Sequence, residues 1–283
     1  MKYKPATHCS LIVATYNWPQ ALKICLNSIR IQSLLPMEVI IADDGSGADT
    51  QELIEIIKKD FPIPIIHIWQ PDEGFQLAKI RNKAFAAANY EYIIQIDGDL
   101  FLHPHFVKDH VSLAKPQYFV TGSRALLDEQ TTKKILSNSN FANVNIFSGK
   151  YSNFFNGLRI GFVRNFLAKR YKIKGRNKYY VKGCNMAFWK NDLVKINAYN
   201  EEFTGWGKED SELAIRLINA GVKKQFIKTG GICYHLYHKE ASRELELRNL
   251  KMMNDAITNK TTWAQKGLGQ YLNNDRLSNS FGA

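Results

Sequence analysis

The sequence predicts an α/β fold with a mostly parallel central sheet flanked by helices. Short apolar segments of strand length recur at regular intervals through the first third of the chain, and amphipathic helical patterns lie between them. Strands joined by such helices run parallel through right-handed crossovers and bind ligands beyond their carboxyl ends. With 283 residues and 45% hydrophobic content, the chain can form one large domain or a domain with an attached smaller subdomain.

The predicted elements can be placed in chain order. The strands are Cys9–Ala14, Glu38–Ala42, Ile65–Trp69 and Tyr92–Ile96. Apolar residues at helical spacing predict three helices between them, marked by Leu22, Leu26 and Ile29, by Leu53, Ile56 and Ile57, and by Leu77, Ile80, Ala84 and Phe85. Polar segments follow three of the strands: Thr15-Tyr16-Asn17, Asp43-Asp44-Gly45-Ser46 and Asp97-Gly98-Asp99. We expect these segments to meet at one rim of the sheet.

The most informative motif is Asp97-Gly98-Asp99, which ends an apolar strand. Side chains two residues apart at a strand end point the same way, so Asp97 and Asp99 can converge, and Gly98 lets a ligand come close. Two carboxylates there suit a divalent cation that also holds phosphate oxygens. The alternative is an ordinary polar turn, because Asp and Gly are common turn residues.

The turn after the first strand contains no glycine between Ala14 and Gln20. It matches neither a dinucleotide-binding fingerprint nor a phosphate-binding Walker loop. A phosphate-bearing ligand would therefore need a metal ion, which again points to the carboxylates after the fourth strand. Asp43 and Asp44 could hydrogen-bond a base or a ribose, or could form a turn that opens the next helix.

Positive charge is the main compositional signal. The formal net charge is +12 and the pI is near 9.4, which favours anionic partners. Basic and aromatic residues are interleaved most densely between Phe154 and Tyr180. This stretch could dock on an anionic membrane surface, or could be a partly helical insertion whose rings pack on the core. Nucleic acid is the least favoured partner, because no nucleic-acid-binding motif accompanies the charge.

Cysteine spacing and hydropathy indicate the cellular compartment in which the protein is expected. Cys9, Cys25, Cys184 and Cys233 lie far apart and predict buried, reduced thiols, with neither a zinc knuckle nor a disulfide framework. No apolar run approaches the ~18 residues that span a bilayer, and the polar start lacks the apolar region of a signal peptide. The expected location is cytoplasmic, with peripheral contact at the inner face of the cell membrane as a further hypothesis.

Four segments resemble glycosyltransferase family 2, whose members have the GT-A fold. They occur in the family's order: Ser10–Asn17, Asp43-Asp44-Gly45-Ser46, Gly74-Phe75 with Arg81-Asn82, and Asp97-Gly98-Asp99. The resemblance implies that a nucleotide-sugar donor is bound by Thr15, Tyr16, Asn17, Asp43, Asp44, Arg81 and Asp97. It also implies manganese or magnesium on the pyrophosphate, held by Asp97 and Asp99.

The chemistry of the Arg81 side chain also favours a role in binding an anionic ligand. A guanidinium on the helix that leads into the fourth strand suits an anionic ligand. The alternative is that Arg81 lies on a solvated helix face together with Lys79 and Lys83.

A second informative segment, Phe203–Asp210, follows the basic stretch. Trp206 stands between two glycines, which leaves its ring on a loop where it can stack on a sugar. Glu209 and Asp210 open a predicted helix, where carboxylates are favourable because of the helix dipole alone.

The segment resembles the carboxyl-terminal half of β-1,4-galactosyltransferases and bacterial chondroitin-type polymerases. The resemblance implies that Asp210 is the catalytic base, and that Glu209 is its neighbour and binds the acceptor beside Trp206. Lys208 replaces a glycine of the galactosyltransferases, so acceptor choice is expected to differ.

Two histidines, His235 and His238, stand at the end of a further predicted strand. Their spacing of three allows shared metal ligation once the strand ends and turns. The resemblance to galactosyltransferases places His238 at the metal-binding histidine and His235 at a methionine, and bacterial members of family 2 could use the other residue. The alternative is that both histidines are structural.

The resemblance implies a metal-dependent, inverting hexosyltransferase. A UDP-sugar would donate a hexose or N-acetylhexosamine to a glycan or lipid-linked glycan in bacterial surface polysaccharide synthesis. The cation would act as Lewis acid on the diphosphate while Asp210 removes the acceptor proton. One base and no second nucleophilic carboxylate predict inversion.

Two other functional classes stay open. One is a non-catalytic module that binds glycan, lipid or nucleic acid. The other is a haloacid-dehalogenase-type phosphatase, although this chain has Phe101 where the motif of that class has Thr or Val.

The expected organisation has four parts. They are a nucleotide-sugar-binding half (1–120), a basic aromatic insertion (121–180), a smaller acceptor-side and catalytic half (181–240), and a carboxyl-terminal helix and tail (241–283).

Overall fold

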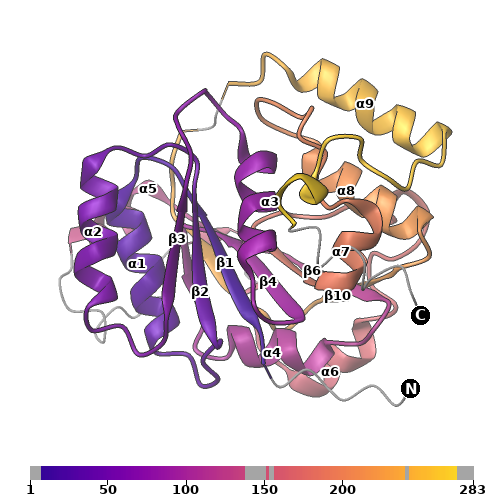
Figure 1. Ribbon diagram of the computed structural model, residues 1–283. Coiled ribbons are helices and arrows are strands. Elements are labelled where there is room, and N and C mark those ends of the chain that lie inside the picture. Colours follow the sequence, from indigo (N-terminus) through magenta and orange to yellow (C-terminus); the bar gives the residue numbers. More distant parts are fainter. Residues whose placement is uncertain (1–7, 138–150, 153–155, 240–241, 273–283) are drawn as a thin grey trace.

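The computed structural model describes residues 8–137, 151–152, 156–239 and 242–272. Its larger sheet has seven strands in the order β10-β6-β9-β4-β1-β2-β3 (Figure 1). Their bounds are β1 Ser10–Thr15, β2 Glu38–Asp43, β3 Ile65–Trp69, β4 Tyr92–Asp97, β6 Tyr118–Gly122, β9 Asn185–Trp189 and β10 Lys223–Ile227. All neighbouring strands are parallel except at β9, which runs antiparallel to both β4 and β6. The predicted α/β fold and mostly parallel sheet are confirmed, and the four predicted strands lie within one residue of their observed bounds.

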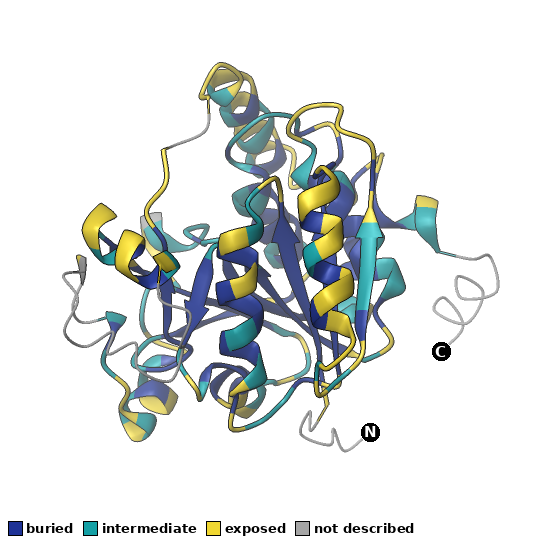
Figure 2. Ribbon diagram, turned by 90° about the vertical axis from the view of Figure 1, so that its left-hand side faces the viewer, coloured by how far each residue is buried: buried dark blue, intermediate teal, exposed yellow. Residues whose placement is uncertain are grey.

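Helices cover both faces of this sheet because its strands alternate their side chains between two core layers. In β1, Leu11 and Val13 face one layer and Ile12 and Ala14 face the other. The first layer is covered by α1 (Pro19–Arg30), α2 (Ala48–Lys58) and α4 (Phe106–Leu113). The second is covered by α3 (Leu77–Ala87), α7 (Lys190–Ile196) and α8 (Glu209–Asn219). Figure 2 shows the strands largely buried, with the exposed residues on the outward faces of the helices.

A second sheet has four strands in the order β5-β11-β7-β8. Their bounds are β5 Leu100–Leu102, β7 Ala125–Leu127, β8 Tyr151–Ser152 and β11 Cys233–His235. This sheet packs with α1 and α5 (Glu129–Ser137) around Phe101, Tyr234 and Leu236. Since β5 begins directly after Asp99 and β11 ends at His235, the second sheet brings these two residues together.

The remaining helices are α6 (Gly161–Leu167), α9 (Glu246–Thr258) and two 3-10 turns, Gly175–Asn177 and Leu268–Tyr271. The predicted carboxyl-terminal helix is α9, which packs on α8. The four cysteines are buried and free, as expected. Among the described residues, no helix is long and apolar enough to cross a membrane. Strands from the predicted 1–120 and 181–240 segments share the larger sheet, and the functional division of the chain stays a prediction.

Candidate active site

Two turns at the carboxyl ends of β1 and β2 are joined by hydrogen bonds. The backbone N–H of Asn17 donates to Ser46 Oγ at 2.9 Å, and the backbone N–H of Gly47 donates to Asn17 Oδ1 at 2.9 Å. Asp43 is fully buried and accepts hydrogen bonds from the backbone N–H of Ser46 at 2.8 Å and from His67 at 3.0 Å. The predicted rim of polar segments therefore exists, and hydrogen bonds between its turns hold their backbone in place.

Asp44, Thr15 and Tyr16 complete this rim. Asp44 is buried and accepts from the Gln70 amide at 2.6 Å and from a backbone N–H at 2.9 Å, and burial raises its pKa to about 6. The Tyr16 ring is 52% exposed and the Thr15 side chain is largely buried. Asp43 and Asp44 thus organise the turn that precedes α2, which was the alternative to ligand binding. The donor-binding roles of Thr15, Tyr16, Asp43 and Asp44 stay predictions.

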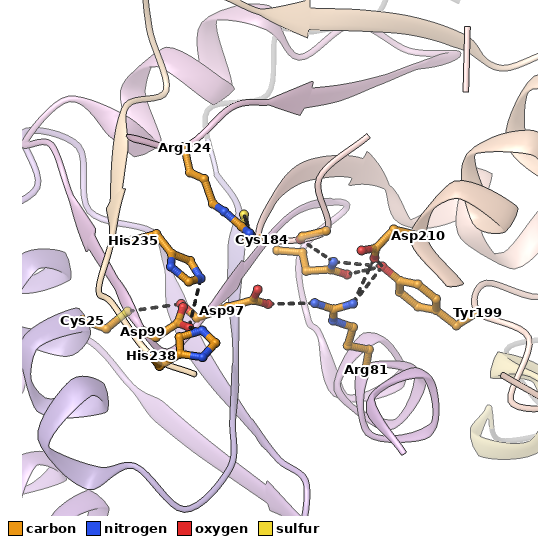
Figure 3. A network of polar contacts seen from close by, with 12 residues as sticks. Cys25, Arg81, Asp97, Asp99, Arg124, Cys184, Tyr199, Asp210, His235 and His238 are labelled. Atoms are coloured by element: carbon orange, nitrogen blue, oxygen red, sulfur yellow. Dashed lines mark hydrogen bonds and ion pairs between the residues drawn. The ribbon is translucent and has the colours of Figure 1, made fainter. Parts of the chain in front are cut away.

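Arg81 is the centre of a buried polar network, although the sequence also allowed it to lie on a solvated helix face. Its side chain is only 1% exposed, which excludes the solvated alternative. Nη2 donates to Asp97 Oδ1 at 2.8 Å, and Nη1 donates to Asp210 Oδ1 at 3.0 Å. Figure 3 shows the guanidinium between these two carboxylates, which come from β4 and α8. Arg81 therefore links the Asp97-Gly98-Asp99 motif to the predicted base.

The Asp210 carboxylate is held by two donors at one of its oxygens. Its Oδ1 also accepts a hydrogen bond from the Tyr199 hydroxyl at 2.7 Å, and that hydroxyl accepts from Gln95 Nε2 at 2.9 Å. Oδ2 lies against Gly183, where an added Cβ would overlap the carboxylate. Arg81 and Tyr199 therefore fix the Asp210 carboxylate through Oδ1, and its role as the base stays a prediction.

Glu209 lies beside Asp210 at the start of α8, as predicted. Its side chain is buried, and Oε2 has no hydrogen-bond partner among the described residues. Burial, followed by the negative charge of Asp210, raises the pKa of Glu209 to about 8. Burial therefore favours the protonated form of Glu209, which can donate a hydrogen bond.

Asp99, His235 and His238 form a separate cluster on the other side of Asp97 (Figure 3). His235 Nε2 lies 3.2 Å and His238 Nε2 lies 3.1 Å from Asp99 Oδ2. Asp99 Oδ1 is buried and has no hydrogen-bond partner in the described part of the chain. Burial by itself would raise the pKa of Asp99, but the hydrogen bonds from both histidines lower it below its ordinary value.

This cluster meets the requirements of a cation site. One ionised carboxylate with an unpartnered oxygen and two imidazole nitrogens are metal ligands, and these atoms lie within 4.8 Å of one another. The structure brings both candidate histidines to Asp99. It does not bring Asp97 into the cluster, because the Asp97 carboxylate is paired with Arg81.

Trp206 lies on a tightly curved loop that precedes α8. Gly205 and Gly207 adopt φ angles of +69° and +103°, which glycine accepts without strain. The backbone N–H of Gly205 donates to the carbonyl of Phe75 at 3.1 Å, and the Arg243 guanidinium lies 4.8 Å from the centre of the Trp206 ring. The loop is thus held between the segment before α3 and the segment before α9.

Sequence analysis missed Tyr199 and Gln95, which position the Asp210 carboxylate. Gln95 did carry a signal, because it is the one amide in the otherwise apolar segment Tyr92–Ile96 and is fully buried. A buried polar side chain needs partners, and Gln95 donates to Tyr199 and to the Gly183 carbonyl. Tyr199 gave no comparable signal.

The basic stretch is only partly available to partners. Arg159 and Arg164 both pair with the buried carboxylate of Asp109, so they neutralise a charge inside the fold. On α6, Phe162 and Phe166 are 80% and 59% exposed. Phe154 and Phe155 lie outside the described residues.

Two family models match the chain. Residues 10–190 match the model "Glycosyl transferase family 2", and residues 164–239 match "N-terminal domain of galactosyltransferase". The chain is 30% identical to a chondroitin synthase of Escherichia coli over 241 residues, which cover 80% of this chain and 34% of that protein. It is 31% identical to a hyaluronan synthase of Pasteurella multocida, covering 80% and 24%. The chain thus spans about a third or less of the length of these relatives.

Solved structures share the fold at lower identity. A fragment of S. aureus TarS in complex with UDP superposes with a TM-score of 0.61 at 17% identity, covering 93% of this chain and 68% of that one. The mannosyltransferase PcManGT from Pyrobaculum calidifontis, in complex with GDP-Man and Mn²⁺, gives 0.60 at 18% identity, covering 92% and 70%. These likenesses confirm the predicted GT-A type of fold.

Proposed function

The chain belongs to glycosyltransferase family 2, and from this membership we propose that it transfers a hexose or N-acetylhexosamine from a UDP-sugar to a hydroxyl group of a glycan acceptor, with inversion. Support for the donor comes from the complex of TarS with UDP. Support for a glycan acceptor in bacterial surface polysaccharide synthesis comes from the chondroitin and hyaluronan synthases. The observation that carries the proposal is the Arg81 bridge, which places the predicted base beside the Asp97-Gly98-Asp99 motif.

The chemistry of transfer follows from the residues around Asp210. With Oδ1 fixed by Arg81 and Tyr199, Oδ2 takes the proton of the acceptor hydroxyl as that oxygen attacks the anomeric carbon. Protonated Glu209 and the Trp206 ring are available to hold the acceptor sugar by a hydrogen bond and by stacking. A single base on one side of the sugar gives inversion.

Asp99, His235 and His238 would hold a divalent cation, which would supply Lewis-acid stabilisation of the diphosphate leaving group. A mixed carboxylate and imidazole set suits Mn²⁺ better than Mg²⁺, which prefers oxygen ligands. Asp97 as a further ligand stays a prediction. Its carboxylate is paired with Arg81 and is not part of the cluster of Asp99, His235 and His238.

The proposal is tested with a panel of nucleotide sugars, in which nucleotide release is measured with and without Mn²⁺. We expect one uridine diphosphate sugar to be turned over faster than the others, and only when Mn²⁺ is present. A generic phosphate ester serves as the control, because a haloacid-dehalogenase-type phosphatase would hydrolyse it without any sugar nucleotide. No release from any donor would favour the non-catalytic binding module.

For location, we propose peripheral binding at the inner face of the cell membrane through α6. Its exposed Phe162 and Phe166 rings, with the neighbouring cations Lys169 and Arg170, resemble a surface that inserts into headgroups. We expect wild type to co-sediment with phosphatidylglycerol vesicles at low salt, and Phe162→Ser/Phe166→Ser to stay in solution. Equal sedimentation of both proteins, or binding that does not change with salt, would contradict docking by α6.

A further inference from the structure

A segment without acidic residues lies along the edge strand β10. The sequence has no Asp or Glu between Glu129 and Asp192, and β10 is at the edge of the larger sheet. The backbone N–H of Phe226 in β10 donates to the carbonyl of Ala168, which joins this segment to the strand. In the described part of the chain, no ion pair joins a carboxylate to a lysine of 169–182. This segment therefore presents positive charge that the fold leaves unbalanced.

Cations and aromatic rings from this segment and from β10 form a compact group, which we call the Tyr180 cluster. Its members are Tyr171, Lys172, Tyr180, Lys182, Phe226 and Lys228. The ammonium groups of Lys172 and Lys182 lie 4.2 and 5.7 Å from the centre of the Tyr180 ring. The Lys228 ammonium lies 5.8 Å from the Tyr171 ring, and both tyrosine rings pack on Phe226.

The cluster is built on a fixed support. Lys224, a buried residue of β10, donates to the carbonyls of Asn177 and Tyr180 at 3.0 and 2.5 Å. Burial, followed by the charge of Lys172, lowers the pKa of Lys224 to about 8. Lys224 therefore fastens the loop that carries Tyr180 to the strand, so that Lys172 and Tyr180 are presented by ordered backbone.

The cations of the cluster destabilise one another. Burial and then the charge of Lys172 lower the pKa of Lys228. Burial and then the guanidinium of Arg124 lower the pKa of Lys182, and Lys172 adds to this effect. Like charges in partly buried surroundings repel one another, and a bound anion would remove that repulsion.

The cluster adjoins the catalytic base. Lys182 directly precedes Gly183, whose Cα lies against the Asp210 carboxylate. The negative charge of Asp210 acts on Lys182 and opposes the lowering of its pKa. Lys182 therefore connects the Tyr180 ring to the residue that contacts the Asp210 carboxylate.

We propose that the Tyr180 cluster is an acceptor subsite and that the acceptor is an anionic glycan, bearing carboxylate or phosphate groups. The proposal rests on the glycosyltransferase activity proposed above and names its acceptor class. Partly buried rings stack on sugars while the ammonium groups beside them pair with the anions. A membrane is the less suitable partner here, because insertion needs exposed apolar side chains, and those are on α6.

The test compares Lys172→Gln/Lys182→Gln with wild type and with Lys58→Gln/Lys59→Gln, a control of equal net charge on the exposed side of α2. Calorimetry at low salt measures binding of a chondroitin oligosaccharide, of its carboxyl-reduced neutral counterpart, and of a phosphorylated oligosaccharide of equal length. We expect the cluster variant to bind the charged oligosaccharides at least about tenfold more weakly than wild type, because contacts to charged groups are lost. The neutral compound should bind all three proteins equally, and the charged probe that binds wild type more tightly identifies carboxylate or phosphate as the natural group.

Two further measurements distinguish failure of the acceptor subsite from failure of the glycosyltransferase activity on which it rests. Nucleotide release from the donor without acceptor should remain measurable in all three proteins, so failure of the activity and failure of the subsite can be told apart. Wild-type affinity for the charged oligosaccharides should fall as salt rises. Equal affinity of wild type and cluster variant for charged and neutral oligosaccharides would overturn the proposal. Loss of phosphatidylglycerol vesicle binding in the cluster variant, with unchanged oligosaccharide binding, would assign the cluster to the membrane instead.

Discussion

Asp210→Asn is expected to lower kcat for sugar transfer by about 10²–10⁴-fold, the range typical of a lost general base. The asparagine carbonyl can still accept hydrogen bonds from Arg81 and Tyr199, so the side chain should keep its place. Arg81 also keeps Asp97 as a charged partner, which protects the fold. Donor and metal affinity should therefore change little, and the loss should be confined to the rate of transfer.

The measurement combines a transfer assay, donor titration and thermal unfolding. Asp60→Asn is the matched control, because it makes the same chemical change at an exposed carboxylate that pairs with Arg30 at the surface. A rate for Asp210→Asn within a few-fold of wild type would show that the base is elsewhere. Glu209 would then be the next residue to test, at raised pH, because burial and the charge of Asp210 raise the pKa of its carboxyl.

Asp99→Ala is expected to abolish Mn²⁺ binding and to lower transfer by roughly 10²–10³-fold, the several kcal/mol that a Lewis-acid cation supplies. The substitution removes the carboxylate that both His235 and His238 contact. Mn²⁺ binding is followed directly by electron paramagnetic resonance, so the result does not depend on activity alone. Single His235→Ala and His238→Ala variants then show which imidazole contributes more to metal affinity.

His103→Ala is the control for the metal prediction, because this partly buried histidine lies outside the cluster. It should bind Mn²⁺ as wild type does. Full transfer activity of Asp99→Ala in the presence of a chelator would rule out a catalytic metal at this site.

Local sequence patterns were sufficient for the elements that carry the site. Short apolar runs placed β1 to β4 within a residue, and the carboxylates of Glu209 and Asp210 marked the start of α8. These features depend on neighbours along the chain. The same reasoning correctly brought Thr15, Asp43 and Asp97 to one rim, because parallel strands end at the same edge.

Contacts between distant segments could not be predicted in this way. The bond between Arg81 and Asp210 joins residues 129 positions apart, and nothing near Arg81 in the sequence distinguishes a buried guanidinium from the solvated lysines around it. Tyr199 belongs to the same long-range network, because its hydroxyl accepts from Arg81, 118 positions away, and from Gln95, 104 positions away. Likewise, the separation of Asp97 from the cluster of Asp99 and the two histidines is decided by Arg81, not by the spacing of the motif.

The antiparallel strand β9 has a consequence for how the chain reaches this structure. β9 lies between β4 and β6, and β6 has only β9 and β10 as neighbours. As the chain leaves the ribosome, β6 therefore has no neighbouring strand of this sheet to pair with until β9, residues 185–189, has followed it. Until then β4 also presents an open edge, of the kind that pairs with other chains. Completion of the sheet is a late, non-local step of folding, and such steps are slow compared with the formation of helices.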